Sequence, residues 1–369
     1  MGVSRLWIIA SSYVPGNLFG WGYNNIGQLG DGTINSSSFP VQIGGQNHWT
    51  AIAGGATAAS GFTLGLTKGK LFAWGDNPSG QLGTGDTTTY SVPTQVGSGT
   101  SWTLVSAGPN NSFALSGGKL YGWGDNTYGQ IGDGSTTIES SPVQIGALTT
   151  WTTVSSGYYH TLAIKGGTLW SWGDNAYGEL GDGTTNPRSS PVQVGAATNW
   201  TAVSSGWGYS LGIAGGGLYA WGNNDIGQLG TGDVTLYSVP TQVGALTTWT
   251  NIAASQAASP QPSHSLGIRA GKLYSWGSNS QGQLGDSTGA DKSSPVQVGA
   301  LTNWTCVATE AIASHGISGS KLFSWGYGAF SELGDGTTNS YNSPVQIGSL
   351  TVWTLVAGAF WDGHALKVK

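Results

Sequence analysis

A segment of about 50 residues recurs seven times along this chain, and this repetition constrains the fold more than any single motif. Each copy carries a Trp-Gly pair and, always 28 residues later, a Trp-Thr pair. The first tryptophans of the copies are Trp21, Trp74, Trp123, Trp172, Trp221, Trp276 and Trp325. The second are Trp49, Trp102, Trp151, Trp200, Trp249, Trp304 and Trp353. Copies without a linker favour one repeat domain over the several domains that 369 residues would otherwise allow.

Each copy contains four short runs that are typical of strands, separated by glycine-rich turns. In the third full copy these runs are 142–145, 151–155, 161–164 and 169–172. We expect Gly157 and the pair Gly166-Gly167 to form the turns, because a positive φ costs little only for glycine. The four runs are grouped here as one unit.

The two ends of the chain complement each other. The seventh copy lacks its last strand, and an unpaired strand of the missing type, 17–21, precedes the first copy. Pairing Leu18–Trp21 with Ala365–Val368 would close a ring and remove exposed sheet edges. The prediction is an all-β, seven-bladed β-propeller of four-stranded blades, closed by its N- and C-terminal strands. Residues 1–14 would form an N-terminal arm and 15–369 the propeller.

The motif Trp-Gly-x-Asn-x-x-Gly-Gln-Leu-Gly, followed by Pro-Val-Gln-Val-Gly, resembles the regulator of chromosome condensation repeat. Its Gly-Gln-Leu-Gly core stands at 27–30, 80–83, 227–230 and 282–285 and is relaxed in the other copies. Kelch repeats have a similar period and double glycines but lack this motif. The resemblance covers about residues 17–369 and implies a seven-bladed propeller with joined ends.

Two activities known in that family lack their determinants here. The nucleotide-exchange activity of the founding member depends on an inserted wedge, and this chain has no insertion of that size. The ultraviolet-sensing plant relative places tryptophans beside arginine, and 206–210 is similar to its motif but lacks the arginine. No enzyme is expected.

Composition excludes several classes of partner. The net charge of −5 argues against nucleic acid, and no apolar run is long enough to span a membrane. The apolar run Leu6–Ala10 is too short for a signal-peptide core. Cys306 is the one cysteine, expected as a small buried residue. No cofactor and no metal is predicted.

Polar motifs within the repeat have a structural and a functional interpretation. The Asp-Gly loops beginning at Asp31, Asp133, Asp182 and Asp335 are either turns braced by hydrogen bonds to the aspartate or weak cation sites. His160 and His264 occupy one repeat position, and a structural role is expected for both. No histidine is spaced between a carboxylate and a nucleophile as catalysis would require.

Charge is segregated along the repeat. Fifteen of the 17 acidic residues lie between a Trp-Gly pair and the next Trp-Thr pair. Nine of the 12 basic residues lie at the turn before the Leu-x-x-Trp strand or at its C-terminal equivalent. These two kinds of connection should lie on opposite faces of the propeller, one acidic and one basic. The charges are either those of ordinary solvated turns or the source of an electrostatic field that orients a docking partner. The longer loops 54–61 and 255–263 should lie on the acidic side.

Three functions are compatible with these patterns. The first is a non-enzymatic structural or binding propeller of a phage or virus particle, a capsid decoration or tail appendage that contacts capsid or tail proteins or a host receptor. The second is a cytoplasmic interaction scaffold or small-GTPase regulator, and the third is a carbohydrate-binding propeller. A virion or extracellular location goes with the first.

Two sets of apolar residues are candidates for interaction. The arm residues Leu6, Trp7, Ile8 and Ile9 either fold back as an outer strand or dock on a partner through the basic face. The exposed aromatic candidates are Tyr158, Tyr159, Trp207, Phe360 and Trp361.

Overall fold

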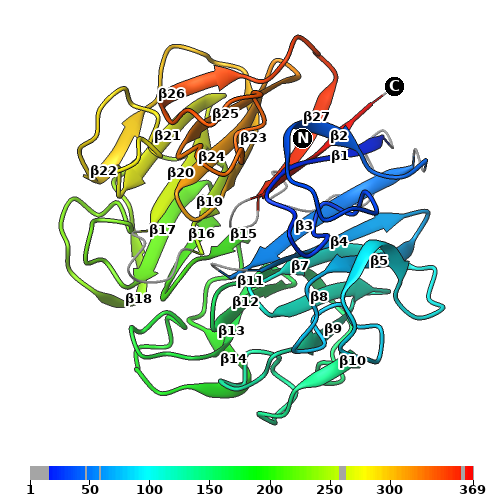
Figure 1. The fold of residues 1–369 in the computed structure, drawn as a ribbon. Helices are drawn as coiled ribbons and strands as arrows, with labels where there is room; N and C mark the ends of the chain where they lie inside the picture. Colours follow the sequence, from blue (N-terminus) through cyan, green and yellow to red (C-terminus); the bar gives the residue numbers. More distant parts are fainter. Residues whose placement is uncertain (1–15, 46–47, 58–59, 257–262, 359–361, 369) are drawn as a thin grey trace.

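Seven four-stranded antiparallel sheets are arranged radially around a central axis in the computed structural model (Figure 1). The structure describes residues 16–45, 48–57, 60–256, 263–358 and 362–368, which form 28 strands. The predicted all-β, seven-bladed propeller is therefore confirmed. The arm candidates Leu6, Trp7, Ile8 and Ile9 lie outside the described residues.

Each blade begins at the axis with a Trp-Thr strand and ends at the rim. Blade 1 contains β3 (Trp49–Ala56), β4 (Gly61–Thr67), β5 (Lys70–Gly75) and β6 (Tyr90–Gln95). Blade 2 contains β7 (Trp102–Ala107), β8 (Asn111–Ser116), β9 (Lys119–Gly124) and β10 (Glu139–Gln144). Blade 3 contains β11 (Trp151–Ser156), β12 (His160–Lys165), β13 (Thr168–Gly173) and β14 (Arg188–Val194). Blade 4 contains β15 (Trp200–Ser205), β16 (Tyr209–Ala214), β17 (Gly217–Gly222) and β18 (Tyr237–Gln242).

The remaining blades follow the same order. Blade 5 contains β19 (Trp249–Ala254), β20 (His264–Arg269), β21 (Lys272–Gly277) and β22 (Lys292–Gln297). Blade 6 contains β23 (Trp304–Thr309), β24 (Ala313–Ser318), β25 (Lys321–Gly326) and β26 (Tyr341–Gln346). Blade 7 contains β27 (Trp353–Gly358), β28 (Asp362–Lys367), β1 (Asn17–Gly22) and β2 (Ser37–Gln42).

The grouping of strands into blades differs from the predicted unit. The strand at 142–145 was predicted to begin the unit of 151–172, but β10 pairs with β9 and ends the preceding blade. Each of these outer strands contains a proline, such as Pro142 in β10. Proline cannot donate a ladder hydrogen bond, so an outer edge is where it fits. Blade 7 consequently takes two strands from each end of the chain rather than one and three.

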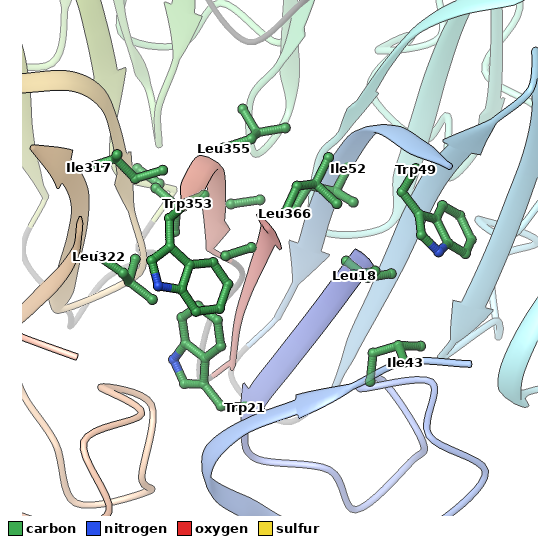
Figure 2. Close-up of a cluster of buried hydrophobic side chains, with 14 of the residues drawn as sticks. Leu18, Trp21, Ile43, Trp49, Ile52, Ile317, Leu322, Trp353, Leu355 and Leu366 are labelled. Atoms are coloured by element: carbon green, nitrogen blue, oxygen red, sulfur yellow. The ribbon is translucent and has the colours of Figure 1, made fainter. Parts of the chain in front are cut away.

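The ends of the chain close the ring as predicted. β1 pairs with β28 antiparallel, from Asn17 opposite Lys367 to Gly22 opposite Asp362. The partners of 18–21 are 363–366, two residues before the predicted segment. Leu18 and Trp21 join Leu366 in a fully buried cluster that also contains residues of blades 1 and 6 (Figure 2).

The tryptophans of the third strands link neighbouring blades. All seven are fully buried, and the indole Nε1 of each donates a hydrogen bond to a carbonyl in the Gly-Gln-Leu-Gly loop of the preceding blade. In Trp172 this bond reaches the Gln130 oxygen at 2.8 Å. The bond satisfies the one polar atom of a large buried ring. The interface between neighbouring blades therefore combines apolar packing with a hydrogen bond that fixes the orientation of the indole.

The tryptophans of the first strands pack within their own blade. Five of them contact the third-strand tryptophan of the same blade edge-on. In blade 3 the ring centroids of Trp151 and Trp172 are 6.1 Å apart. Trp353 packs instead on Phe19, and Trp102 packs on Tyr121. The paired rings form the apolar interior of each blade.

Glycine is required in the turns for two different reasons. Gly166 and Gly167 have φ of 56° and 80°, as the predicted turn demands. Gly157 does not have a positive φ, contrary to expectation. A Cβ there would lie 2.8 Å from the Gly206 oxygen of the next blade. Glycine is therefore needed at this position because the two blades pack too closely for a side chain.

Candidate functional site

Opposite charges leave the blades on opposite faces of the disc. All 17 acidic residues of the sequence lie on the side where the first strand turns into the second and the third loops into the fourth. We call these loops the acidic face. The bases on it, Arg188 and Lys292, form ion pairs with Asp182 at 2.9 Å and Asp286 at 3.5 Å. The acidic face therefore has no uncompensated cation among the described residues.

The opposite side, which we call the basic face, consists of the turns between second and third strands. The eight other described bases lie there, at Lys68, Lys70, Lys119, Lys165, Arg269, Lys272, Lys321 and Lys367. Some of them lie over aromatic rings, as Lys165 does over Trp170 with Nζ 4.5 Å from the ring centroid. This charge separation follows from the topology together with the predicted positions of the charges.

Two of the predicted aromatic candidates form one cluster on the acidic face. Tyr158 and Tyr159, in the first loop of blade 3, contact each other with ring centroids 4.5 Å apart. Tyr128, from the long loop of blade 2, lies 4.4 Å from Tyr159 and is 42% exposed. Tyr128 was not predicted from the sequence, because its contact with blade 3 forms only when the blades pack together.

The third candidate, Trp207, belongs to a second cluster one blade further on. Its ring lies 5.4 Å from that of Tyr177. Trp207 comes from the first loop of blade 4 and Tyr177 from the long loop of blade 3, so the construction repeats that of Tyr159 and Tyr128. Phe360 and Trp361 lie outside the described residues.

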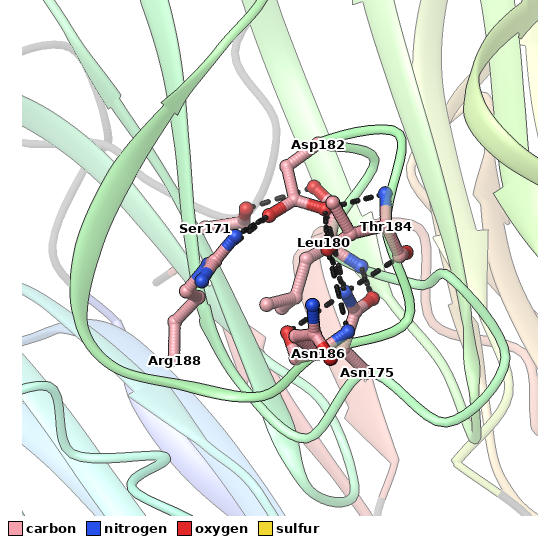
Figure 3. A network of polar contacts seen from close by, with 7 residues as sticks. All are labelled: Ser171, Asn175, Leu180, Asp182, Thr184, Asn186 and Arg188. Carbon is pink, nitrogen blue, oxygen red and sulfur yellow. Dashed lines mark hydrogen bonds and ion pairs between the residues drawn. The ribbon is translucent and has the colours of Figure 1, made fainter.

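The Asp-Gly loops are braced turns. Asp182 accepts hydrogen bonds from the Thr184 backbone N at 2.9 Å and hydroxyl at 2.6 Å (Figure 3). The Asn175 amide nitrogen donates to the same carboxylate and to the Thr184 carbonyl, so this amide lies where a cation would. Burial alone would raise the pKa of Asp182, but the bonds from Thr184 and then Arg188 outweigh it and lower the pKa.

The threonine–aspartate hydrogen bond that holds this loop also forms when the two residues exchange positions. In blades 1 and 4 threonine and aspartate swap places, and Thr84 still bonds Asp86 at 2.7 Å. The Asp86 carboxylate also accepts from Tyr90. These contacts support the structural interpretation of the loops, and among the described residues no group of three His, Cys, Asp or Glu side chains could hold a metal ion.

A narrow cavity of about 80 Å³ follows the axis of the disc. The first strands line it with small residues, and Gln256 Nε2 closes over it to donate to the Ser156 carbonyl at 2.6 Å. On this measure one water molecule needs about 10–15 Å³, so the cavity has room for several waters but not for a partner protein. Recognition of a larger partner therefore falls to the face loops.

A buried network inside blade 6 was not predicted from the sequence. His315 contacts Glu310 Oε1 through Nε2 at 2.5 Å and Ser324 Oγ through Nδ1 at 2.8 Å. The expectation that no histidine would lie between a carboxylate and a hydroxyl was thus wrong. All three side chains are buried within the sheet, so no substrate reaches Ser324 and the network is structural.

The network could have been suspected from departures from the repeat. His315 stands where blades 1, 3, 4 and 5 have leucine, and Glu310 stands where blades 1 to 4 have glycine. Burial raises the pKa of Glu310 well above its ordinary value, and the nearby Glu332 and Asp362 raise it further. Burial lowers the pKa of His315 to about 3, so the pair is a neutral acid beside a neutral imidazole.

His160, His264 and Cys306 have the expected buried positions. His160 Nε2 pairs with Ser210 Oγ at 2.9 Å, and His264 Nε2 pairs with Ser314 Oγ at 2.8 Å, each across a blade seam. Burial raises the pKa of the Cys306 thiol to about 11, which leaves it unreactive at neutral pH.

Comparison with known families agrees with this architecture. The model of the regulator of chromosome condensation (RCC1) repeat matches seven stretches, at 15–59, 68–115, 117–164, 166–213, 215–259, 270–311 and 320–359. The chain belongs to the RCC1 repeat family. Human protein RCC2 is 40% identical over 74 residues, a match that covers 20% of this chain and 14% of RCC2.

Two solved structures have the same fold. Human WBSCR16 superposes with a TM-score of 0.82 at 20% identity, covering 96% of this chain and 99% of that one. Prp20p from Saccharomyces cerevisiae superposes with a TM-score of 0.83 at 20% identity, covering 98% and 95%. The Prp20p structure was described together with its binding to Gsp1p and histones. At this identity the likeness concerns the fold alone.

Within the RCC1 repeat motif, two blades carry glutamate in place of the usual glutamine. Glu179 and Glu332 each accept a backbone hydrogen bond from the residue two positions earlier, as the glutamines do. Burial raises the pKa of both carboxyls from 4.5 to about 7. A raised folded-state pKa means that stability present at acid pH is lost as pH rises from about 4.5 through 7.

Replacing Glu179 by Gln should therefore stabilise the protein at pH 8 to 9 and change it little at pH 5. One pKa unit corresponds to about 1.4 kcal/mol, so the gain at alkaline pH should reach about 3 kcal/mol. Melting temperatures measured across this pH range would show it. The reciprocal variant Gln283→Glu, at a position where Nε2 has no partner among the described residues, should introduce the same alkaline loss. Equal gains at pH 5 and pH 9 would contradict the explanation.

Proposed function

We propose that this chain is a non-enzymatic interaction propeller that binds another protein through its acidic face. The observation that carries the proposal is that the 13 acidic residues outside the buried core all lie on one side, where Arg188 and Lys292 are already paired. Such a field steers and orients an approaching partner of opposite charge. The aromatic clusters on the same face supply the apolar contact area that protein interfaces favour.

Family membership favours this scaffold hypothesis over a virion component. The virion hypothesis, with capsid, tail or host-receptor partners, rested on composition alone, and neither the fold nor the comparisons support it. Prp20p was described with binding to Gsp1p and histones, which are proteins. A protein partner for this chain is proposed by analogy with it, and the cytoplasmic alternative for location goes with that partner. In the described part of the chain, no helix has the length and hydropathy needed to span a membrane.

Charge reversal on the two faces tests the proposal. The variant Asp76→Lys, Asp125→Lys, Asp174→Lys changes one equivalent position in three consecutive blades of the acidic face. The control Lys70→Glu, Lys119→Glu, Lys321→Glu makes the same change in charge, with opposite sign, on the basic face. Proteins captured by the intact chain from its source cells should fall at least about tenfold in recovery with the first variant and persist with the second. Undiminished capture by the acidic-face variant would contradict the proposal.

A further inference from the structure

Two aromatic clusters on the acidic face share one construction that includes a carboxylate. In the seam between blades 2 and 3, the rings of Tyr128 and Tyr158 both contact Tyr159. Asp125, the residue that follows Trp-Gly in blade 2, lies near enough to Tyr159 to act on it electrostatically. Burial first, and then the neighbouring tyrosines and Asp125, raise the pKa of Tyr159 to about 12. Tyr159 is therefore a neutral ring close to a carboxylate. We call these four residues the first cage.

The second cage repeats this arrangement between blades 3 and 4. Trp207 and Tyr177 lie at 5.4 Å, and Asp174 follows Trp-Gly in blade 3 as Asp125 does in blade 2. Asp174 is near enough to the buried Glu179 to act on it electrostatically, and Glu179 holds the backbone N of Tyr177 at 2.8 Å. Carboxylate and rings thus lie within one loop and its neighbour.

The loops that carry the rings are held by hydrogen bonds. Tyr128 N donates to Gln130 Oε1 at 2.8 Å. Tyr158 N donates to the Gly206 carbonyl of blade 4 at 3.2 Å. Trp207 N donates to the Ser255 carbonyl in the next blade at 3.1 Å. A partner side chain would therefore meet preformed clusters and would lose little binding energy in ordering them.

The charge around the rings favours a cation over a sugar. The planes of Tyr128 and Tyr159 are inclined by 43°, those of Tyr158 and Tyr159 by 75°, and those of Tyr177 and Trp207 by 49°. Inclined contacts of this kind are the ordinary packing of aromatic pairs, and ring faces that the contacts leave uncovered are negative and attract a cation. The half-buried carboxylates and the acidic surroundings add to this preference for positive charge.

We propose that the two cages bind two cationic side chains, lysine or arginine, of one basic segment of the partner protein. This inference rests on the proposed function, because it identifies the chemistry that the acidic face recognises. A cation over a ring contributes within about 6 Å of the centroid, and arginine does so most often. Adjacent blades repeat the cage, so one extended segment meets two equivalent positions.

The blade 1–2 seam provides a natural control. Asp76 occupies the position of Asp125, but Ser79 replaces the tyrosine of the long loop, and Pro109-Asn110 replaces the aromatic pair of the neighbouring loop. This seam therefore has the carboxylate without the rings. A cage effect should be present at Asp125 and absent at Asp76.

Titration calorimetry with an acetylated, amidated hexa-arginine peptide tests the inference. The intact protein should bind this peptide and should not bind its hexa-citrulline counterpart, which keeps the shape and loses the charge. Tyr128→Ala and Trp207→Ala should each weaken binding roughly twofold to fivefold, as expected for one exposed cation–aromatic contact. The double variant should multiply the two effects. Asp125→Asn should weaken binding clearly more than Asp76→Asn.

Several results would overturn the cages. They are no binding of hexa-arginine, equal binding of hexa-citrulline, or equal weakening by Asp76→Asn and Asp125→Asn. The last result would leave the acidic face as a diffuse docking surface and the proposed function intact. Failure of the proposed function itself would show in the charge-reversal capture experiment, which does not depend on these rings. Unchanged melting temperatures of Tyr128→Ala and Trp207→Ala would establish that the variants remain folded.

Discussion

Replacing Trp172 by Ala is expected to lower the free energy of unfolding by about 3–5 kcal/mol. The Trp172 ring is fully buried between blades 2 and 3 and packs on Trp151 and Phe113. Its Nε1 also satisfies the Gln130 carbonyl at 2.8 Å, so the substitution leaves both a cavity and a buried carbonyl that loses this donor. Guanidinium denaturation followed by circular dichroism would measure the loss.

Trp170 provides the matched control for this prediction. It lies two residues away on β13 and also contacts Trp151, at 6.0 Å, but it is only half-buried and carries Lys165 over its ring. Trp170→Ala should therefore cost distinctly less. If the two variants lost the same stability, burial in the blade seam would not explain the importance of the periodic tryptophan. A ligand-binding role would instead leave the stability of Trp172→Ala unchanged.

The architecture was predictable from the sequence because its determinants are periodic. Spacing alone marks Trp172 and its counterparts, and a seven-fold spacing with complementary ends leaves a closed ring as the simplest solution. The blade boundary was not predictable from spacing, since any cyclic shift of four strands gives the same period. Proline in the outer strand, as at Pro142, carried the missing information.

The candidate site was predictable only in part, because it forms between blades. Tyr159 and Trp207 stand out as aromatics in loops, but Tyr128 and Tyr177 occupy variable positions inside the repeat motif. About 30 residues separate the members of each contact, and only the radial packing of adjacent blades brings them together. Glu310 and His315 were missed because each replaces an ordinary core residue, and burial is not visible in a sequence pattern.

Deleting residues 1–24 is expected to remove most of the stability of the ring. The deletion removes β1, which carries Leu18 and Trp21 into the buried closing cluster and is the sheet partner of β28. Losing two buried side chains of this size costs roughly 5–10 kcal/mol, which is comparable to the whole stability of a typical domain. Among the described strands β1 is the one neighbour of β2, so β2 loses its place in the sheet, and β28 becomes an exposed edge that favours aggregation.

Deleting only residues 1–14 is the control, because it shortens the chain and leaves β1 in place. Its melting temperature should stay close to that of the intact protein, whereas the longer deletion should melt at a much lower temperature or fail to fold cooperatively. A synthetic peptide of residues 15–24, added in trans, should restore part of the lost melting temperature by pairing with β28. The same peptide with Leu18→Asp should not restore it, since Leu18 is fully buried in the closed ring. A longer deletion that melts at the temperature of the intact protein would show that the pairing of the chain ends does not hold the ring together.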